Sequence, residues 1–221
     1  MIDLHTHTTF SDGVLIPTEA ARRAKVAGYE AMCFTDHCDD SNLPLILDNI
    51  CRVSTNYSPF LGIDLFCGVE ITHVPPGLIP RMIETVRDFG AQLVVVHGET
   101  IVEPVEQGTN LAAIEAGCDI LAHPGLITPE EAKLAAERGV YLEITTRKGH
   151  SLTNGHVAAL ARQYGAKLVI NNDAHAPGDW ISREMRRAVA LGAGLNEEEC
   201  RAAEANSREL VRTMIARLRR K

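Results

Sequence analysis

The sequence predicts an α/β fold in which parallel strands close into a distorted barrel with helices on the outside. Apolar runs of strand length alternate with helix-like segments along the whole chain. The runs are apolar throughout, which is typical of parallel strands that are covered on both faces. There are seven such runs, and six of them are closely followed by a His, Asp or Glu side chain.

The position of these polar side chains favours a barrel over an open sheet. In a closed parallel barrel, the C-terminal ends of all strands meet at one mouth, where the chemistry collects. In an open doubly wound sheet, only the strands beside the switch point share a crevice. We therefore expect a single domain, residues 1–221, with its functional site at the C-terminal mouth and a barrel distorted by having seven strands.

The first strand is the short apolar run that leads to His5 and His7. Side chains two residues apart on a strand point to the same face, so both imidazoles can bind one metal ion. Asp12 follows five residues after His7. A helix is then expected from Ile16 to Val26, because Pro17 is favoured in a first helical turn.

The later elements repeat this alternation of strand and helix. Thr128, followed by Pro129 and two glutamates, is a typical helix start. Further strands are expected at 31–35, 65–69, 92–96, 119–122, 140–144 and 167–170. Further helices are expected at 43–53, 78–89, 109–116, 128–139, 154–164 and 181–191, with a short helix capped by Asn196 and a last one capped by Asn206 or Ser207. Residues 57–62 and 98–108 are expected to be loops, the second a substrate loop.

Composition and charge narrow the class of protein. The chain has 221 residues, 45% apolar and 23% charged, as is ordinary for a globular protein. No apolar run approaches the roughly 20 residues that span a bilayer. The chain opens on a strand, so we expect no targeting peptide, no membrane partner and a cytoplasmic location. A net charge of −7 disfavours a nucleic-acid partner, although bound cations would offset it, and the basic run 212–221 resembles a solvated helix end.

The six cysteines form no CxxC pair. In a reducing compartment, we expect them to be small buried hydrophobic residues and neither disulfides nor zinc ligands. They are Cys33, Cys38, Cys51, Cys67, Cys118 and Cys200.

Nine polar side chains next to the strand ends form a candidate metal site. For any single one of them, a helix cap or a hydrogen-bonded core histidine would be the simpler explanation, but chance does not readily place all nine there. Six imidazoles and three carboxylates suit Zn, Mn or Fe ions better than Mg or Ca ions. The candidate ligands are His5, His7, Asp12, His37, Glu70, His97, His123, Asp173 and His175.

At these positions the chain resembles the PHP (polymerase and histidinol phosphatase) family over essentially its whole length. The motifs that carry the resemblance are Leu4-His5-Thr6-His7 with Ser11-Asp12-Gly13, Thr35-Asp36-His37, Gly68-Val69-Glu70, Val96-His97, Ala122-His123-Pro124 and Asp173-Ala174-His175. The resemblance implies a distorted (β/α)7 TIM-like barrel with two or three divalent metal ions at its mouth.

The resemblance also implies a ligand set for each ion. One ion would be held by His5, His7, Glu70 and Asp173, a second by Asp12, His37 and His175, and a third by His97, His123 and the bridging Glu70. Some family members have a histidine near Asp12, so the carboxylate here can change the metal preference of its site. Asp36 would support a ligand or carry a proton.

The strand at 140–144 lacks an evident ligand but leads to Arg147, Lys148 and His150. A guanidinium beside metal ions can bind phosphate oxygens, so Arg147 is a candidate for that role and equally for a solvated loop charge. Lys148 is more simply a loop charge, and His150 is a candidate acid for the leaving group.

Arg183 is a second phosphate candidate, although an exposed helix residue is its simpler reading. His73 and His156 are expected to be surface histidines, and Trp180 either walls the pocket or belongs to the core.

Together these residues predict metal-dependent hydrolysis of a small phosphate monoester, such as a histidinol-phosphate-like metabolite. Bound metals lower the pKa of water toward about 7 and would supply hydroxide at neutral pH. Three alternatives remain: a phosphodiesterase or nuclease acting on nucleotides with the same metals, a metal-dependent amidohydrolase, and a non-catalytic binding module. No strand ends directly on a bridging lysine, which counts against the amidohydrolase, and the full ligand set counts against the binding module.

Overall fold

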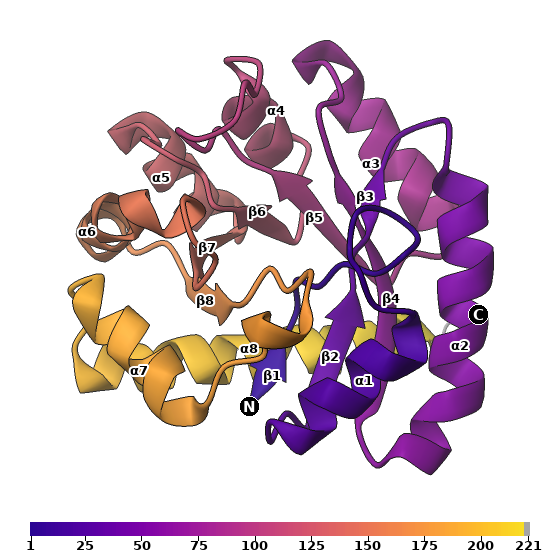
Figure 1. Cartoon of the computed structure of the whole chain (residues 1–221). Helices are drawn as coiled ribbons and strands as arrows, with labels where there is room; N and C mark the ends of the chain where they lie inside the picture. The colour runs from indigo at the N-terminus through magenta and orange to yellow at the C-terminus, as the bar shows by residue number, and fades with distance from the viewer. Residues whose placement is uncertain (219–221) are drawn as a thin grey trace.

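The computed structural model describes residues 1–218, so the last three residues of the basic run 212–221 lie outside the described part. Seven parallel strands form a nearly closed barrel in the order β1-β2-β4-β5-β6-β7-β8, which confirms the predicted fold class (Figure 1). An eighth, very short strand, β3 (His37–Cys38), pairs only with β4. The barrel strands are β1 (Ile2–Asp3), β2 (Ala31–Phe34), β4 (Asp64–Ile71), β5 (Leu93–His97), β6 (Ile120–Ala122), β7 (Tyr141–Thr145) and β8 (Leu168–Asn171).

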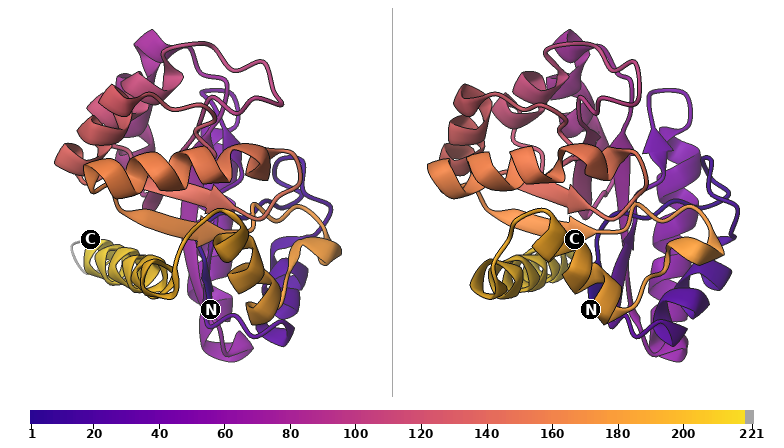
Figure 2. Two further views of the ribbon diagram at one scale, coloured as in Figure 1. Left: turned by 90° about the vertical axis from the view of Figure 1, so that its left-hand side faces the viewer. Right: turned by 60° about the vertical axis from the view of Figure 1, so that its left-hand side comes forward.

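Helices surround the strands on the outside, as the rotated views show (Figure 2). The predicted start at Thr128 is confirmed, because its hydroxyl accepts from the Glu131 amide while the Glu131 carboxylate accepts from the Thr128 amide. The helices are α1 (Pro17–Val26), α2 (Leu43–Leu61), α3 (Ile79–Asp88), α4 (Thr109–Glu115), α5 (Pro129–Arg138), α6 (Asn154–Tyr164), α7 (Arg183–Gly192) and α8 (Glu197–Leu218), with 3-10 turns at Pro76–Leu78, His150–Thr153 and Pro177–Asp179. None of the helices in residues 1–218 combines the length and the apolar character that crossing a bilayer needs.

Two predicted boundaries are wrong. Helix α2 continues through the predicted loop 57–62 and through Pro59, and it ends at Gly62, whose φ of 66° suits a left-handed C-cap. The predicted start of a last helix at Asn206 or Ser207 is wrong, because both residues lie inside one long helix, α8. The Asn206 side-chain amide instead donates to the Leu168 carbonyl of β8.

The barrel closes between β1 and β8 just beyond the ends of these strands. The His7 amide donates to the Ala174 carbonyl at 2.8 Å, and the Leu4 amide donates to the Asn171 side-chain oxygen at 3.0 Å. The two segments that carry the first and last metal motifs are therefore joined directly.

Inside the barrel, a core of inward-facing side chains fills the end opposite the mouth. This core includes Leu4, Phe66 and Val95, and the α8 side chains Leu210 and Met214 complete it. Helix α8 runs behind the barrel in the view of Figure 1 and packs against β8 and β1. Because this end is filled, the functional site must open at the C-terminal mouth.

The expectation that all six cysteines are free is wrong. Cys51 of α2 and Cys67 of β4 form a disulfide with a Cα–Cα distance of 5.1 Å. Cys67 lies on the outward face of β4, where α2 packs, so the fold brings together two residues whose separation of 16 carries no sequence motif. Cys33, Cys38 and Cys118 are free and buried, as expected.

Candidate metal centre

The structure brings all nine candidate ligands together at the C-terminal mouth. They form four overlapping groups in which the potential ligand atoms lie within 4.8 Å of one another. The groups are His7, Asp12, His37 and His175; His5, His123 and Asp173; His5, His7 and Glu70; and Glu70, His97 and His123.

Extended or strained backbone directs these side chains into the mouth. His5 and His7 lie just past β1, and the residue between them, Thr6, turns its hydroxyl the other way to bond the Cys33 carbonyl. His123 and Asp173 have positive φ angles of 26° and 52°, which are uncommon for non-glycine residues. Backbone strain of this kind is concentrated at functional sites.

Two buried carboxylates form the centre of the cluster. Glu70 Oε1 lies 3.2 Å from His5 Nε2 and 3.5 Å from His123 Nε2. Asp173 Oδ1 lies 3.2 Å from His7 Nε2. Glu70 therefore contacts imidazoles from two of the implied sites, which is the arrangement that a bridging carboxylate needs.

The outer part of the cluster contains Asp12. Its Oδ1 lies 3.1 Å from His175 Nε2 and 3.5 Å from His37 Nε2. The Asp12 side chain is more than half exposed, whereas the carboxylates of Glu70 and Asp173 are buried. This part of the cluster is thus the side that faces solvent.

Several buried atoms of the cluster have no hydrogen-bond partner among residues 1–218. An unpaired polar atom is costly to bury, so native proteins rarely leave one without a partner. Divalent cations shared by these imidazoles and carboxylates would satisfy them, and we conclude that the residues fit such ions. The unpaired atoms are His5 Nε2, His7 Nδ1 and Nε2, Glu70 Oε1 and Oε2, His123 Nδ1 and Asp173 Oδ1.

Electrostatics keeps two carboxylates and one imidazole of the cluster, those of Glu70, Asp173 and His7, in their metal-binding forms. Burial alone would raise the pKa of Glu70, but His5, His37 and His97 hold it well below its usual range. The pKa of Asp173 is likewise held low, against burial, by His5 and His7. Burial and His37 lower the pKa of His7 to about 3. Anionic carboxylates and a neutral imidazole are the forms that bind metals.

Glu143, which was not among the predicted site residues, contacts the cluster from the interior of the barrel. Its carboxylate lies 2.9 Å from His5 Nδ1 and accepts hydrogen bonds from the His123 amide and the Asn171 side chain. A carboxylate on the far nitrogen of a ligating histidine fixes its tautomer and orientation. The available signal was a glutamate in the middle of an apolar strand, at an inward-facing position of β7.

Asp36 lies close to the site, but within residues 1–218 its carboxylate forms no ion pair with an imidazole. Its buried carboxylate accepts from the Thr8 amide at 2.7 Å and from the Ser11 hydroxyl at 2.8 Å. These bonds hold the segment that leads to Asp12. Asp36 therefore positions a candidate ligand and is not itself one.

Arg147 reaches the mouth as predicted. Its Nη1 donates to the Asp173 carbonyl at 3.1 Å and lies 2.8 Å from His175 Nδ1. Lys148 is exposed beside it. His150 is buried, with its ring stacked on His123 at 4.3 Å between centroids and its Nδ1 bonded to Thr100. Burial and His123 lower the pKa of His150 to about 4, which favours the neutral imidazole.

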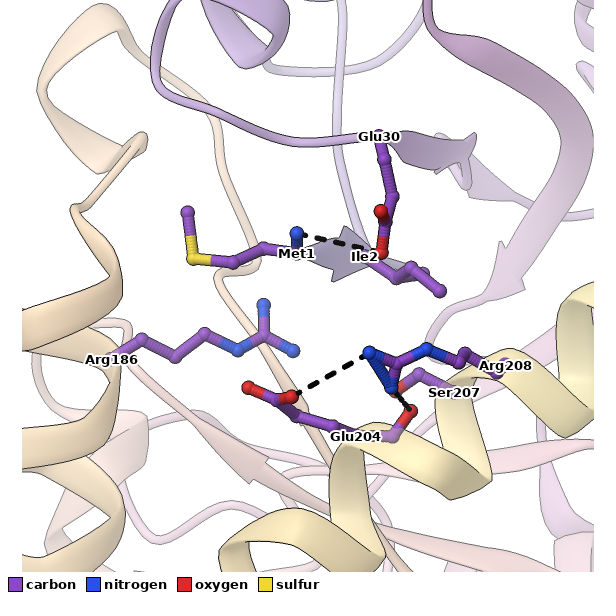
Figure 3. Close-up of a pocket in the computed structure, with 7 residues that line it drawn as sticks. All are labelled: Met1, Ile2, Glu30, Arg186, Glu204, Ser207 and Arg208. Atoms are coloured by element: carbon purple, nitrogen blue, oxygen red, sulfur yellow. Dashed lines mark hydrogen bonds and ion pairs between the residues drawn. The ribbon is translucent and has the colours of Figure 1, made fainter.

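Arg183, the second phosphate candidate, lies away from the metal cluster, in agreement with its simpler reading as an exposed helix residue. Arg183 is exposed and pairs with Glu204 of α8 at 3.3 Å. Figure 3 shows Glu204 beside Met1 and Ile2, at the start of β1 and thus at the barrel end away from the mouth. Proximity in sequence to the last metal motif did not indicate the direction in which the chain continues.

The remaining ring side chains considered in the sequence, His73, His156 and Trp180, lie in three different places. His156 is exposed, as expected, and its ring bonds to the Ile127 carbonyl. Trp180 packs edge-on against Tyr29 beside the core. His73, by contrast, lies at the mouth. It lines a cavity of about 320 Å³ together with Asp12, His37, Asp39, Thr72 and Glu103.

Comparison with known proteins places this site in context. A family model described as PHP domain matches residues 3–121, just over half of the chain. An uncharacterized protein of Methanocaldococcus jannaschii is 48% identical over 199 residues, which is 89% of this chain and 91% of that protein.

Two more distant relatives carry functional names. A probable phosphatase of Thermoanaerobacter sp. (strain X514) is 27% identical, with 90% of this chain and 88% of that protein covered. Ribonuclease P protein component 3 of Methanosarcina mazei is also 27% identical, with 85% of this chain and 79% of that protein covered.

Proposed function

The chain belongs to the PHP domain family of metal-dependent phosphoesterases, and from this premise we propose that it hydrolyses a small phosphate monoester. The observation that carries the proposal is the meeting of nine potential ligands around buried, unpaired nitrogen and oxygen atoms at one barrel mouth. Imidazoles and carboxylates together suit Zn, Mn or Fe ions.

We assign the ligands to two or three divalent ions. His5, His7, Glu70 and Asp173 would hold the first ion; Asp12, His37 and His175 the second; and His97, His123 and the bridging Glu70 the third. The contacts of Glu70 with both His5 and His123 support this bridging role.

When bound, such ions supply hydroxide near neutral pH and neutralise charge on the phosphoryl group. Arg147 would bind a phosphate oxygen with the guanidinium N–H groups that its protein contacts leave free. Lys148 would add positive charge at the rim. His150 remains a candidate for contact with the leaving group, and Asp36 positions the segment that carries Asp12.

The cavity beside the cluster favours a small monoester over a polynucleotide. None of the described residues that line it is Lys or Arg, and it presents the carboxylates of Asp39 and Glu103. A further phosphate group would be repelled there, whereas a neutral or cationic alcohol, such as that of a histidinol-phosphate-like metabolite, would be accepted. The relative named as a probable phosphatase agrees with this proposal.

A phosphodiesterase or nuclease is the second candidate function. It would use the same metal ligands, and the relationship to a ribonuclease P protein component favours it. In that case nucleic acid would be the partner, and the bound nucleic-acid chain would not pass through the acidic cavity.

A substrate panel separates the two candidates. The protein is freed of metal by chelation, reloaded with Mn²⁺ or Zn²⁺, and assayed on p-nitrophenyl phosphate, bis(p-nitrophenyl) phosphate and a short RNA. We expect metal-dependent hydrolysis of the monoester, with Arg183→Ala as active as the wild type. Activity that survives complete chelation would refute the metal mechanism, and faster cleavage of the diester or RNA would favour the second candidate.

A further inference from the structure

The loop between β5 and α4, residues 98–108, has a firmly held base. The Glu99 carboxylate accepts from the amides of Gly108 and Asn110, both at 2.9 Å. The Asn110 side chain in turn accepts from the Glu99 amide and donates to the Pro124 carbonyl. With both ends tied together, the loop presents its middle residues at a defined place over the mouth.

Glu103, in the middle of this loop, points its carboxylate at three imidazoles. Its oxygens lie 3.0 Å from His97 Nε2, 3.4 Å from His150 Nε2 and 3.9 Å from His73 Nε2. Among these three histidines, only His97 belongs to the nine candidate ligands. Glu103 therefore joins the edge of the metal cluster to two imidazoles outside it.

His73, at this edge of the cluster, has a strained backbone, as residues of functional sites often do. Its φ of 53° makes it one of only three non-glycine residues with positive φ in the described chain, and the other two, His123 and Asp173, are candidate ligands. The strained backbone sets its ring against His97, with 5.4 Å between centroids. A strained conformation persists only where the surrounding structure enforces it.

The third group of ligands has room for one more donor. It contains Glu70, His97 and His123. Glu103 lies outside this group, because its oxygens are not within 4.8 Å of all three ligand atoms, so its side chain would have to turn toward them to share the ion. Zinc sites take four ligands when closed, or three plus an exchangeable position when catalytic. Nitrogen and oxygen ligands at about 2.1 Å from one ion are separated by about 3.0 to 3.4 Å, and Glu103 lies 3.0 Å from His97 Nε2.

We propose that Glu103 is an exchangeable fourth ligand of the third metal ion and that the substrate's phosphate displaces it. Its contact with His97 alone among the candidate ligands, and a side chain that is 39% exposed, place it on the solvent side, where a phosphate would enter. The inference rests on the proposed function, because it needs the three-ion assignment and a phosphate ligand.

The test compares Glu103→Gln with the wild type in a Zn²⁺ titration of chelated protein. The matched control is Glu106→Gln, an exposed glutamate of the same loop whose side chain makes no hydrogen bond or ion pair among the described residues. We expect Glu103→Gln to bind the third equivalent at least tenfold more weakly and the first two unchanged. We also expect inorganic phosphate to bind the variant more tightly at saturating Zn²⁺, because a competing carboxylate is gone.

The outcomes separate this inference from the proposed function. Unchanged affinity for the third equivalent in Glu103→Gln, or a wild-type stoichiometry of two, would overturn the role of Glu103 while leaving a metal-dependent phosphatase intact. A matching loss in Glu106→Gln would also overturn it, since the effect would then come from the loop's charge. Thermal unfolding of each variant checks that the fold is retained.

Discussion

At the scale of single residues, Glu143 explains how the first metal ligand is held. It bonds His5 Nδ1, the His123 backbone and Asn171 from beneath the cluster. Burial alone would lower the pKa of His5, but Glu143 and Glu70 raise it well above its usual value. The same carboxylate thus orients one proposed ligand and the backbone of another.

We predict that Glu143→Gln weakens metal binding by about 10- to 100-fold, the usual effect of losing such a supporting carboxylate. The measurement is the zinc content after dialysis against buffers of fixed free Zn²⁺. Glu209→Gln, which removes only an exposed partner of Lys167, serves as the control. Equal zinc affinity of Glu143→Gln and the wild type would show that His5 does not need this support.

Arg147 carries the second prediction at this scale. If its guanidinium binds the substrate phosphate, Arg147→Ala loses charged hydrogen bonds worth about 1.5–3 kcal/mol, or roughly 10- to 100-fold in kcat/KM. Steady-state kinetics on p-nitrophenyl phosphate measures the loss, with Arg183→Ala as the matched control. A kcat/KM within twofold of the wild type would exclude the role.

Sequence reasoning located the nine candidate ligands because each follows an apolar strand, and parallel strands all end at one mouth. It missed Glu143, which lies inside a strand, and it gave no role to Glu103, whose position depends on how the loop folds back. It could not decide between a phosphate ligand and an exposed helix residue for Arg183, because a sequence distance from His175 carries no direction.

At the scale of elements, helix α2 and strand β4 are joined both by packing and by the Cys51–Cys67 disulfide. No sequence motif indicates this bond, since the spacing of the two cysteines matches none and buried cysteines are common. Helix α2 is also longer than the predicted 43–53, because it continues through Pro59 to Leu61. The apolar face formed by Ile46, Leu47 and Ile50 anchors the helix on the barrel.

We predict that the disulfide contributes about 3 kcal/mol to the free energy of unfolding, as expected for a closed loop of roughly 15 residues. Urea unfolding with and without dithiothreitol measures this contribution. Dithiothreitol should lower the midpoint of the wild type and leave that of Cys51→Ser unchanged. A wild-type midpoint that does not respond to the reductant would contradict the prediction.

At the scale of the whole molecule, the barrel has one closed end and one open end. Leu210 and Met214 of α8 help to fill the closed end, while the other end gathers imidazoles and carboxylates from all along the chain. The alternation of strands and helices, together with the polar side chains at the strand ends, was sufficient to predict this architecture. The role of α8 was not predictable, because its pattern resembles that of any surface helix.

The most direct test of the account is the number of metal ions bound per chain. Elemental analysis of protein equilibrated with Zn²⁺ or Mn²⁺ should give two or three ions per chain, and Glu70→Gln, which removes the bridging carboxylate, should lower the ratio by at least one. A wild-type ratio near zero, or a ratio unchanged in Glu70→Gln, would contradict a shared metal centre at the barrel mouth.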